Sequence, residues 1–229
     1  MQKADYHSSR IFSNQEGIHP KLEEIVTKHL NSQFRRPIAQ HTQLAFDKIK
    51  HQVEDHLKSN HHSLIFDSCC GTAISTRKIA QANRNSLVIG IDRSIKRLSK
   101  EYTKTLPTNV ILVQAECSDF WRLALDAGWQ LERHYLLYPN PYPKSSQLKR
   151  RWHAHPVYPS LLALGGRIEL RSNWSLYIEE FYAAFLVSQY KNRSAYTETF
   201  IPDDYLTLFE KKYDRSGHTL YRCVINLCR

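Results

Sequence analysis

Three acidic residues each follow a short apolar stretch of the sequence, where a carboxylate can bind a nucleoside-type cofactor. They are Asp67, Asp92 and Glu116. Asp92 lies twenty-one residues after Gly71, a spacing at which an acidic side chain holds the hydroxyl pair of a ribose. Glu116 is followed by Cys117, and we expect these two to border an adenine ring.

The segment after the first acid has the spacing of a glycine-rich turn. Small residues stand at Cys69, Gly71 and Ala73, where the backbone must approach a ligand closely. Only one of the three is glycine, so the turn alone is a weak indication. We include Cys69 and Gly71 in the expected cofactor site.

This combination of acids and small residues favours S-adenosylmethionine over a dinucleotide. The former has no pyrophosphate, which would need more glycines, while its amino group and ribose hydroxyls favour carboxylates. The alternative is that Asp67 and Asp92 only cap the helices that follow them. Acids at three successive positions of this kind favour the cofactor interpretation.

A stiff, basic loop follows the fourth apolar run. Residues 138–144 contain three prolines around Asn140, and such a loop can hold a reacting base with little entropy to lose. Four basic residues then occur within eight positions without an acid, which suits contact with phosphates: Lys144, Lys149, Arg150 and Arg151. The alternative is a solvated charge run, which leaves the stiff loop unexplained.

The elements that must position these residues alternate in type. Short apolar runs predict strands at 63–67, 86–92, 109–115, 134–139 and 166–172. Amphipathic stretches predict helices near 73–83, 94–103, 118–127 and 147–164, and a longer helix after Trp174. Alternation of this kind predicts a Rossmann-like, doubly wound α/β fold with a mainly parallel sheet. The tail 217–227 adds a late strand at or near the sheet edge, and ligands are expected at the carboxyl ends of the strands.

The N-terminal part differs from this pattern. Apolar residues recur at helical spacing from Leu22 to Leu30 and from Ala45 to Leu57, which predicts two helices with packing faces. We therefore divide the chain into an N-terminal helical extension, residues 1–60, and a second domain, residues 61–229.

Composition limits the class of protein. Thirty-two Lys and Arg face 22 Asp and Glu, a formal charge of +10 that favours a polyanionic partner over a neutral one. No run of residues is apolar enough for a membrane span, and the first residues have no signal-peptide pattern. We expect no membrane association.

The cysteines and histidines do not form a recognisable metal motif. Five cysteines without CxxC spacing suit a reducing, cytoplasmic compartment. The histidines at 51, 56, 61 and 62 lie in a charged stretch without metal-site spacing, so we expect a solvated helix face and no metal.

The chain resembles the bacterial tRNA (guanine-N7)-methyltransferase family in a series of ordered motifs. That family has Phe-Pro-Asp-Pro-Trp-Pro-Lys, a Lys-Arg-Arg cluster, Gly-Gly before a strand ending in Thr-Asp-Trp, and a late Thr-x-Phe/Tyr-Glu. The corresponding segments here are 138–144, 149–151, 165–166, 172–174 and 207–210. The resemblance covers about 160 residues and leaves most of 1–60 without a counterpart.

The resemblance implies the fold of class I S-adenosylmethionine-dependent methyltransferases and assigns roles to single residues. It implies cofactor contacts at Asp67, Asp92, Glu116 and Asn140, with Asn140 also the catalytic candidate. It implies contacts with the base or the tRNA at Lys144, Asn173, Thr207, Phe209 and Glu210. We therefore expect a tRNA methyltransferase, with guanine N7 as its target.

Two departures from the family leave alternatives open. The family's Asp is replaced by Asn at positions 140 and 173, which removes two charges on the substrate side while the cofactor acids are kept. Activity on guanine N7 is one interpretation. The others are a methyltransferase acting on another nucleic-acid or exocyclic amine acceptor, and a catalytically silent RNA-binding paralogue. The sequence does not indicate an oligomeric state.

Overall fold

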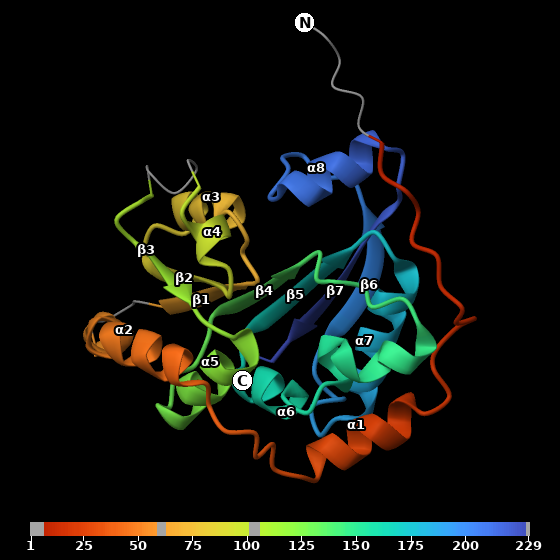
Figure 1. Cartoon of the computed structure of the whole chain (residues 1–229), viewed down its shortest axis with the longest axis horizontal. Helices are drawn as coiled ribbons and strands as arrows, with labels where there is room; N and C mark the ends of the chain where they lie inside the picture. The colour runs from red at the N-terminus through yellow and green to blue at the C-terminus, as the bar shows by residue number, and fades with distance from the viewer. Residues whose placement is uncertain (1–6, 59–62, 101–105, 228–229) are drawn as a thin grey trace, which may run out of the picture.

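A mixed sheet with helices on both faces forms the centre of the computed structural model, which describes residues 7–58, 63–100 and 106–227 (Figure 1). Its seven strands have the order β3-β2-β1-β4-β5-β7-β6. Strands β1 to β5 run parallel, whereas β7 is antiparallel to both of its neighbours. The strands are β1 Ser63–Ser68, β2 Ser86–Asp92, β3 Val110–Gln114, β4 Arg133–Leu137, β5 Arg167–Ser172, β6 Ala195–Phe200 and β7 Leu220–Asn226.

The helices divide between the two faces of the sheet. Helices α3, α4 and α8 lie on one side, and α1, α2, α5, α6 and α7 lie on the other (Figure 1). Their bounds are α1 Leu22–Leu30, α2 Gln40–Lys58, α3 Ile74–Ala82, α4 Ile95–Leu98, α5 Cys117–Asp126, α6 Tyr158–Ala163, α7 Ser175–Val187 and α8 Leu208–Arg215. This arrangement confirms the predicted Rossmann-like, doubly wound α/β fold.

Side-chain alternation along β1 shows why the sheet needs cover on both faces. Leu64 and Phe66 belong to the larger core, under α2, α5 and α7, while Ile65 belongs to the smaller core with Ile79 of α3. The side chains of Leu64, Ile65 and Phe66 are fully buried. Successive residues of a strand point to opposite faces, so a strand with apolar side chains on both faces is stable only between two layers of helices.

One predicted helix differs from the structure, and one strand was not predicted. The helix predicted over 147–164 is wrong: two 3-10 segments, Ser145–Arg150 and Trp152–Ala154, precede the short α6. Between them Arg151 has an extended backbone and turns its side chain into the interior. The late strand β7 lies next to the edge of the sheet, near the edge as predicted, and the edge itself is β6, which the sequence analysis did not predict.

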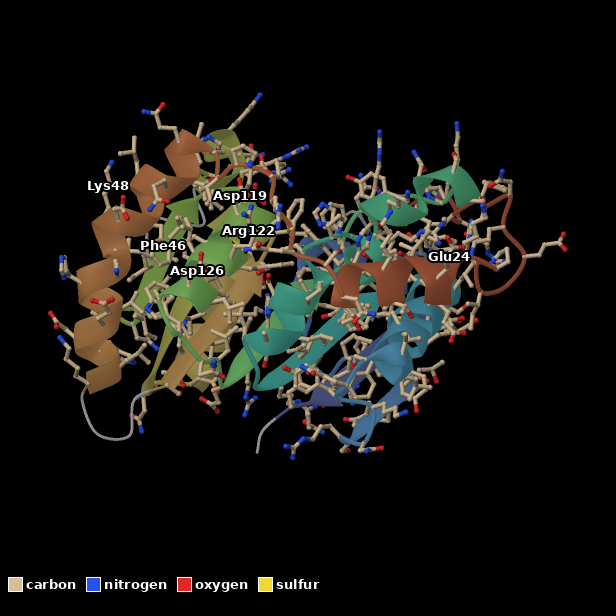
Figure 2. All side chains as sticks on the ribbon, turned by 90° about the horizontal axis from the view of Figure 1, so that it is seen from below. Glu24, Phe46, Lys48, Asp119, Arg122 and Asp126 are labelled. Carbon is tan, nitrogen blue, oxygen red and sulfur yellow. The ribbon has the colours of Figure 1, made fainter. Side chains whose placement is uncertain are left out.

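The N-terminal helices pack against the rest of the molecule. Leu22 and Val26 of α1 and Phe46 and Val53 of α2 are buried, which confirms the predicted packing faces. Phe46 lies between α2 and α5, whereas Lys48 points outward (Figure 2). The predicted boundary at 60 and 61, with His61 and His62, lies outside the described residues. In the part of the chain that is described, no helix has the length and apolar character of a membrane span.

Candidate active site

Asp67 lies in β1 and is almost completely buried, yet only one of its carboxylate oxygens has partners. Oδ2 accepts hydrogen bonds from Ser75 at 2.7 Å and Thr76 at 2.6 Å. Oδ1 has no partner among the described residues. Burial raises the pKa of Asp67 to about 6, against the opposing effect of the two hydroxyls. An oxygen that is buried and unpaired is costly, so Oδ1 is suited to a donor from a ligand.

The turn after β1 is held in a left-handed conformation at alternate residues. Cys69, Gly71 and Ala73 have φ angles of 62°, 61° and 59°. Residues with a Cβ pay about 1–2 kcal/mol in this region. A Cβ added to Gly71 would meet no atom within 4 Å, so this part of the turn faces open space. The alternating small residues therefore form a tight turn that a ligand can approach.

Asp92 at the end of β2 fixes that turn. Its carboxylate accepts hydrogen bonds from the Gly71 amide at 2.9 Å and the Ser94 amide at 2.8 Å, and it pairs with Arg97 at 3.1 Å. A carboxylate has about four acceptor positions, so capacity for a further hydroxyl remains. Asp92 is not the cap of the helix that follows it, because the N-cap of α4 is Ser94, whose hydroxyl accepts from the Arg97 amide.

Glu116 and Cys117 border the same edge from the next strand. Glu116 precedes α5 and is half-buried, and its side chain does not cap the helix. Its backbone amide donates to Thr42 of α2 at 3.1 Å. Cys117 is buried, and its sulfur lies 3.7 Å from that of Cys69. The structure therefore brings the predicted cofactor residues 67, 69, 71, 92, 116 and 117 to one edge of the sheet.

Arg151 corrects the prediction of a phosphate contact. Its side chain is fully buried, forms an ion pair with Glu180 of α7 and donates to the Tyr142 carbonyl at 3.0 and 3.1 Å. The guanidinium also lies over the Trp174 ring, 4.9 Å from its centroid. An arginine enclosed in this way cannot reach a phosphate. It holds the proline-rich loop from the interior side instead.

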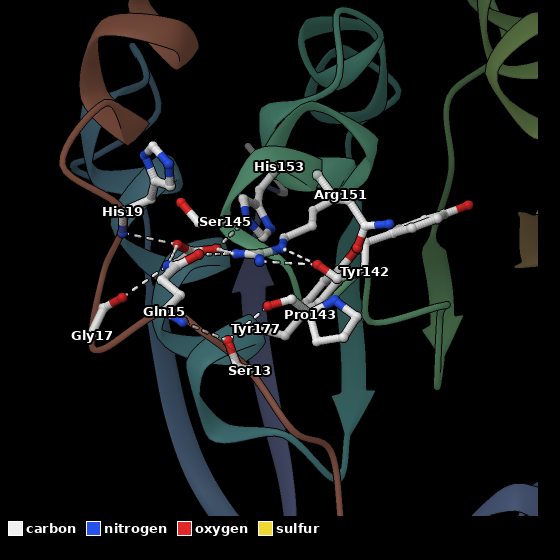
Figure 3. Close-up of polar contacts among 12 residues, drawn as sticks. Ser13, Gln15, Gly17, His19, Tyr142, Pro143, Ser145, Arg151, His153 and Tyr177 are labelled. Atoms are coloured by element: carbon white, nitrogen blue, oxygen red, sulfur yellow. Dashed lines mark hydrogen bonds and ion pairs between the residues drawn. The ribbon is translucent and has the colours of Figure 1, made fainter.

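Glu180 is the centre of this network and was missed by the sequence analysis. Besides Arg151 it binds His153 at 3.1 Å, and it accepts from the Gln15 side chain and the His19 amide (Figure 3). Burial alone would raise the pKa of Glu180, but its hydrogen bond with His153 and the charge of Arg151 lower that pKa to about 2. The loop is thereby tied to α7 and to the N-terminal segment. The sequence did contain a signal for this network, because Glu180 is an acid on the apolar face of the predicted helix after Trp174.

The N-terminal segment also contacts the loop directly. The Ser13 hydroxyl donates to the Pro143 carbonyl at 2.7 Å, and the Ser145 amide donates to Asn14 at 3.0 Å. Residues 8–19 run from beside α8 to α1 (Figure 1) and pass the carboxyl edge of the sheet. The sequence analysis did not predict that the N-terminal extension contacts this loop.

Glu210 likewise has an interior position where a substrate contact was predicted. It is fully buried and accepts from the Tyr138 hydroxyl at 3.0 Å and from Arg171 at 2.9 Å. The Thr207 hydroxyl caps α8 by accepting from the Glu210 amide at 2.9 Å. Tyr138 starts the loop with a φ of 53°. Glu210 and Thr207 therefore fix α8 and the start of the loop. Both Glu210 oxygens have partners within the protein, because Oε2 accepts from the Leu206 amide at 2.7 Å, so Glu210 has a structural role where a base contact was predicted.

The remaining predicted substrate residues are at the surface. Asn140, Lys144, Lys149 and Arg150 are exposed, and Phe209 is 54% exposed. Phe209 stacks on Tyr213 with ring centroids 6.0 Å apart. These side chains are free to meet a large ligand.

Asn173 has a partner that fixes its orientation. Its Nδ2 lies 3.1 Å from His218 Nδ1, and His218 Nε2 lies 2.9 Å from the Ser8 carbonyl oxygen. A carbonyl only accepts, so Nε2 carries the proton and Nδ1 accepts from the asparagine amide. An aspartate at this position would not donate to that nitrogen. The amide orientation leaves Asn173 Oδ1 as an acceptor, and His218 was not identified from the sequence.

No group of three or more His, Cys, Asp or Glu side chains in the described part of the chain is placed to hold a metal ion. His51 is 94% exposed and lies 4.0 Å from Glu54.

Several solved structures share this fold. A 16S rRNA methyltransferase, KamB, has a TM-score of 0.55 at 13% identity, covering 77% of this chain and 93% of its own. An antibiotic-related methyltransferase has a TM-score of 0.53 at 15% identity, covering 76% and 92%. At these identities the likeness concerns the fold, and it agrees with the predicted class I methyltransferase fold.

Sequence comparisons match most of the chain. A tRNA (guanine-N(7)-)-methyltransferase of Alkaliphilus metalliredigens is 22% identical, over 78% of this chain and 89% of the relative. Those of Geobacillus sp. and Streptococcus gordonii are 25% and 27% identical, over 74% and 72% of this chain and 80% and 82% of the relatives. The family model described as "Putative methyltransferase" matches residues 61–223. This match spans more than half of the sequence, and the chain belongs to that methyltransferase family.

Proposed function

We propose that the protein is a cytoplasmic S-adenosylmethionine-dependent methyltransferase that acts on N7 of guanine in tRNA. The relatives named for this activity support the substrate, and the net charge of +10 supports a nucleic-acid partner. The observation that carries the cofactor assignment is the buried, unpaired Oδ1 of Asp67.

The residues at the carboxyl edge of β1, β2 and β3 fit this cofactor. Asp67 Oδ1 would accept from its amino group, and Asp92 would accept from its ribose hydroxyls. The open side of Gly71 leaves room beside the turn, and Glu116 and Cys117 would border the adenine. When bound, S-adenosylmethionine supplies a methyl group on a positively charged sulfur.

The substrate side acts by positioning the base. Guanine N7 has a lone pair and no proton, so no general base is needed for its methylation. Asn140 and Asn173 offer amide oxygens to the base, and the loop that carries Asn140 is held by Arg151 and Glu210 from the interior. A rigid loop reduces the entropy lost when the base is aligned.

Amides in place of the family's acids change the electrostatics of the transfer. Positive charge passes to the base, and a carboxylate about 4 Å away would stabilise it by roughly 4 kcal/mol at an effective dielectric of 20. An amide retains the acceptor atom without most of that stabilisation. We therefore expect a slower transfer than an aspartate at position 140 would give.

A second acceptor is favoured by the orientation of Asn173. Its Oδ1 is left free by the bond to His218, and an amide oxygen can accept from the N–H of an exocyclic amine. Methylation of such an amine is the alternative activity.

The decisive experiment combines labelled S-adenosylmethionine with tRNA and nucleoside analysis. Total tRNA should yield labelled 7-methylguanosine. A tRNA transcript containing 7-deazaguanosine, which lacks the N7 nucleophile, is the matched control and should accept no label. Labelled N-methyl nucleosides would identify the exocyclic amine activity, and tRNA binding without any transfer would identify a silent RNA-binding protein.

A further inference from the structure

Two cysteines from different elements meet at the proposed cofactor site. Cys69 belongs to the turn after β1, and Cys117 is the first residue of α5. Their sulfurs are 3.7 Å apart, although 48 residues separate them in the chain. Cys69 is exposed and Cys117 is buried, so one thiol of the pair is accessible to a dissolved reagent.

The backbone at position 69 favours glycine. Its φ of 62° is in the left-handed region, which glycine adopts without the strain that a Cβ brings. A cysteine is nevertheless present at this position. Its thiol lies next to a second thiol, that of Cys117.

We propose that Cys69 and Cys117 form a reversible disulfide in the presence of a peroxide, and that this bond closes the cofactor site. The second part rests on the proposed function. A disulfide has a sulfur–sulfur distance of about 2.05 Å, shorter than the 3.7 Å between the two thiols, and in this proposal the turn that carries Cys69 moves toward α5 as the bond forms. Gly71, two residues further, donates to Asp92, and the movement therefore disturbs the ribose-binding carboxylate as well.

The reaction balances with hydrogen peroxide as the oxidant. The Cys69 sulfur attacks a peroxide oxygen and the O–O bond breaks. The departing hydroxide takes up the Cys69 thiol proton and becomes the first water, and Cys69 becomes a sulfenic acid. The Cys117 sulfur then attacks the Cys69 sulfur. An S–S bond forms, the S–O bond breaks, and the Cys117 proton leaves with the hydroxyl as the second water. Two thiols lose two electrons in total, and a dithiol reductant reverses the change.

Burial and the position of the pair set the order of these steps. The hydrogen bond with Cys69 and burial raise the pKa of the Cys117 thiol well above its usual value. A thiol in this state is a weak nucleophile toward a dissolved oxidant. Cys69 therefore reacts first, and Cys117 reacts because it is next to the sulfenic acid.

Peptide mapping tests whether the bond forms. Tryptic cleavage places Cys69 and Cys70 in the peptide 59–77 and Cys117 in the peptide 105–122. In the Cys70→Ser variant a link between these peptides can only involve Cys69. Hydrogen peroxide should produce this linked pair in Cys70→Ser, and dithiothreitol should remove it. Cys69→Gly, which suits the backbone, and Cys117→Ala should give no linked pair under the same treatment.

Calorimetry of oxidised and reduced protein tests whether the bond closes the site. In the Cys70→Ser variant, oxidation should weaken S-adenosylmethionine binding at least tenfold, and reduction should restore it. In Cys69→Gly the two treatments should give equal affinity. A linked peptide with unchanged affinity overturns the closure, and the absence of the linked peptide overturns the disulfide.

The same measurements separate this inference from the proposed function. If the reduced protein binds no S-adenosylmethionine, the proposed function and the closure both fail. The peptide map still decides whether Cys69 and Cys117 form the bond.

Discussion

The residues at the carboxyl ends of β1 and β2 and those that follow β4 and β5 are held in place in opposite ways. At β1 and β2 the predicted ligand residues are themselves buried, and Asp67 and Asp92 are fixed by hydroxyl and amide donors of the adjoining turns. At β4 and β5 the surface residues Asn140, Lys144 and Lys149 lie on a loop that other, buried residues hold.

The difference matches the sizes of the two proposed ligands. A small cofactor needs a few carboxylates in fixed positions, which burial and hydrogen bonds provide. A tRNA needs a broad, accessible surface, so the fixing groups have to be placed behind it. Arg151 and Glu210 do this work on the substrate side, and neither needs to touch the RNA.

Replacement of Arg151 should produce the largest effect. Arg151→Met leaves Glu180 buried without its charged partner, and breaking such a pair typically costs 3–5 kcal/mol. We expect a loss of that size in the free energy of unfolding, measured by urea denaturation. The neighbouring exposed Arg150→Met is the matched control and should change stability by no more than about 0.5 kcal/mol. Equal effects of the two variants would mean that Arg151 does not hold the loop.

Asp67 should give the free protein a stability that decreases with rising pH. Its pKa in the folded protein is about 6, above the ordinary aspartate value, so the folded state holds the proton more tightly. Stability from this group is complete below about pH 4 and is lost as the pH rises through about 6, with a total of about 3 kcal/mol.

Asp67→Asn tests this dependence and the cofactor contact together. The variant should be more stable than the wild type at pH 8 and should bind S-adenosylmethionine more weakly, because the amide lacks the charge. Urea denaturation at pH 5 and pH 8 and titration calorimetry measure the two effects. A variant with unchanged affinity would remove Asp67 from the cofactor site.

Asn140→Asp should produce a smaller effect, on rate alone. A carboxylate on this loop would face the charge that develops on guanine, and a tenfold faster transfer corresponds to about 1.4 kcal/mol, within the electrostatic stabilisation given above. Single-turnover rates on the same tRNA measure it, since they exclude product release. Gln147→Glu adds the same charge to the same segment and should not accelerate transfer. A slower Asn140→Asp enzyme would favour the exocyclic amine as acceptor.

The exposed basic residues should give the smallest effect of the series. Lys149→Ala should lower the slope of log affinity for tRNA against log salt concentration by about 1, as expected for one lost phosphate contact. Lys48→Ala, on the outer side of α2 (Figure 2), is the control and should leave the slope unchanged. Equal slopes for Lys149→Ala and wild type would identify the run 149–150 as a solvated surface.

The sequence determined the parts of this protein that depend on neighbouring residues. Apolar runs bounded by turns located β1 to β5, with β2 predicted at its observed bounds, Ser86–Asp92. Acids at the ends of β1 and β2 located the edge that we propose for the cofactor, because parallel strands have their carboxyl ends at one side of a sheet. These inferences needed only local spacing and the rule for that fold class.

Only the tertiary structure separated Arg150 from Arg151. Both are basic residues of one run, but one is exposed and the other pairs with Glu180, 29 residues away. The same applies to His218, which contacts Asn173 and also Ser8, 210 residues before it in the chain, and to the thiols of Cys69 and Cys117. Which distant side chains meet depends on how the layers of helices and sheet pack. A polar side chain that becomes buried needs a hydrogen-bond partner in the interior. Local spacing in the sequence contains no information about which residue that partner is.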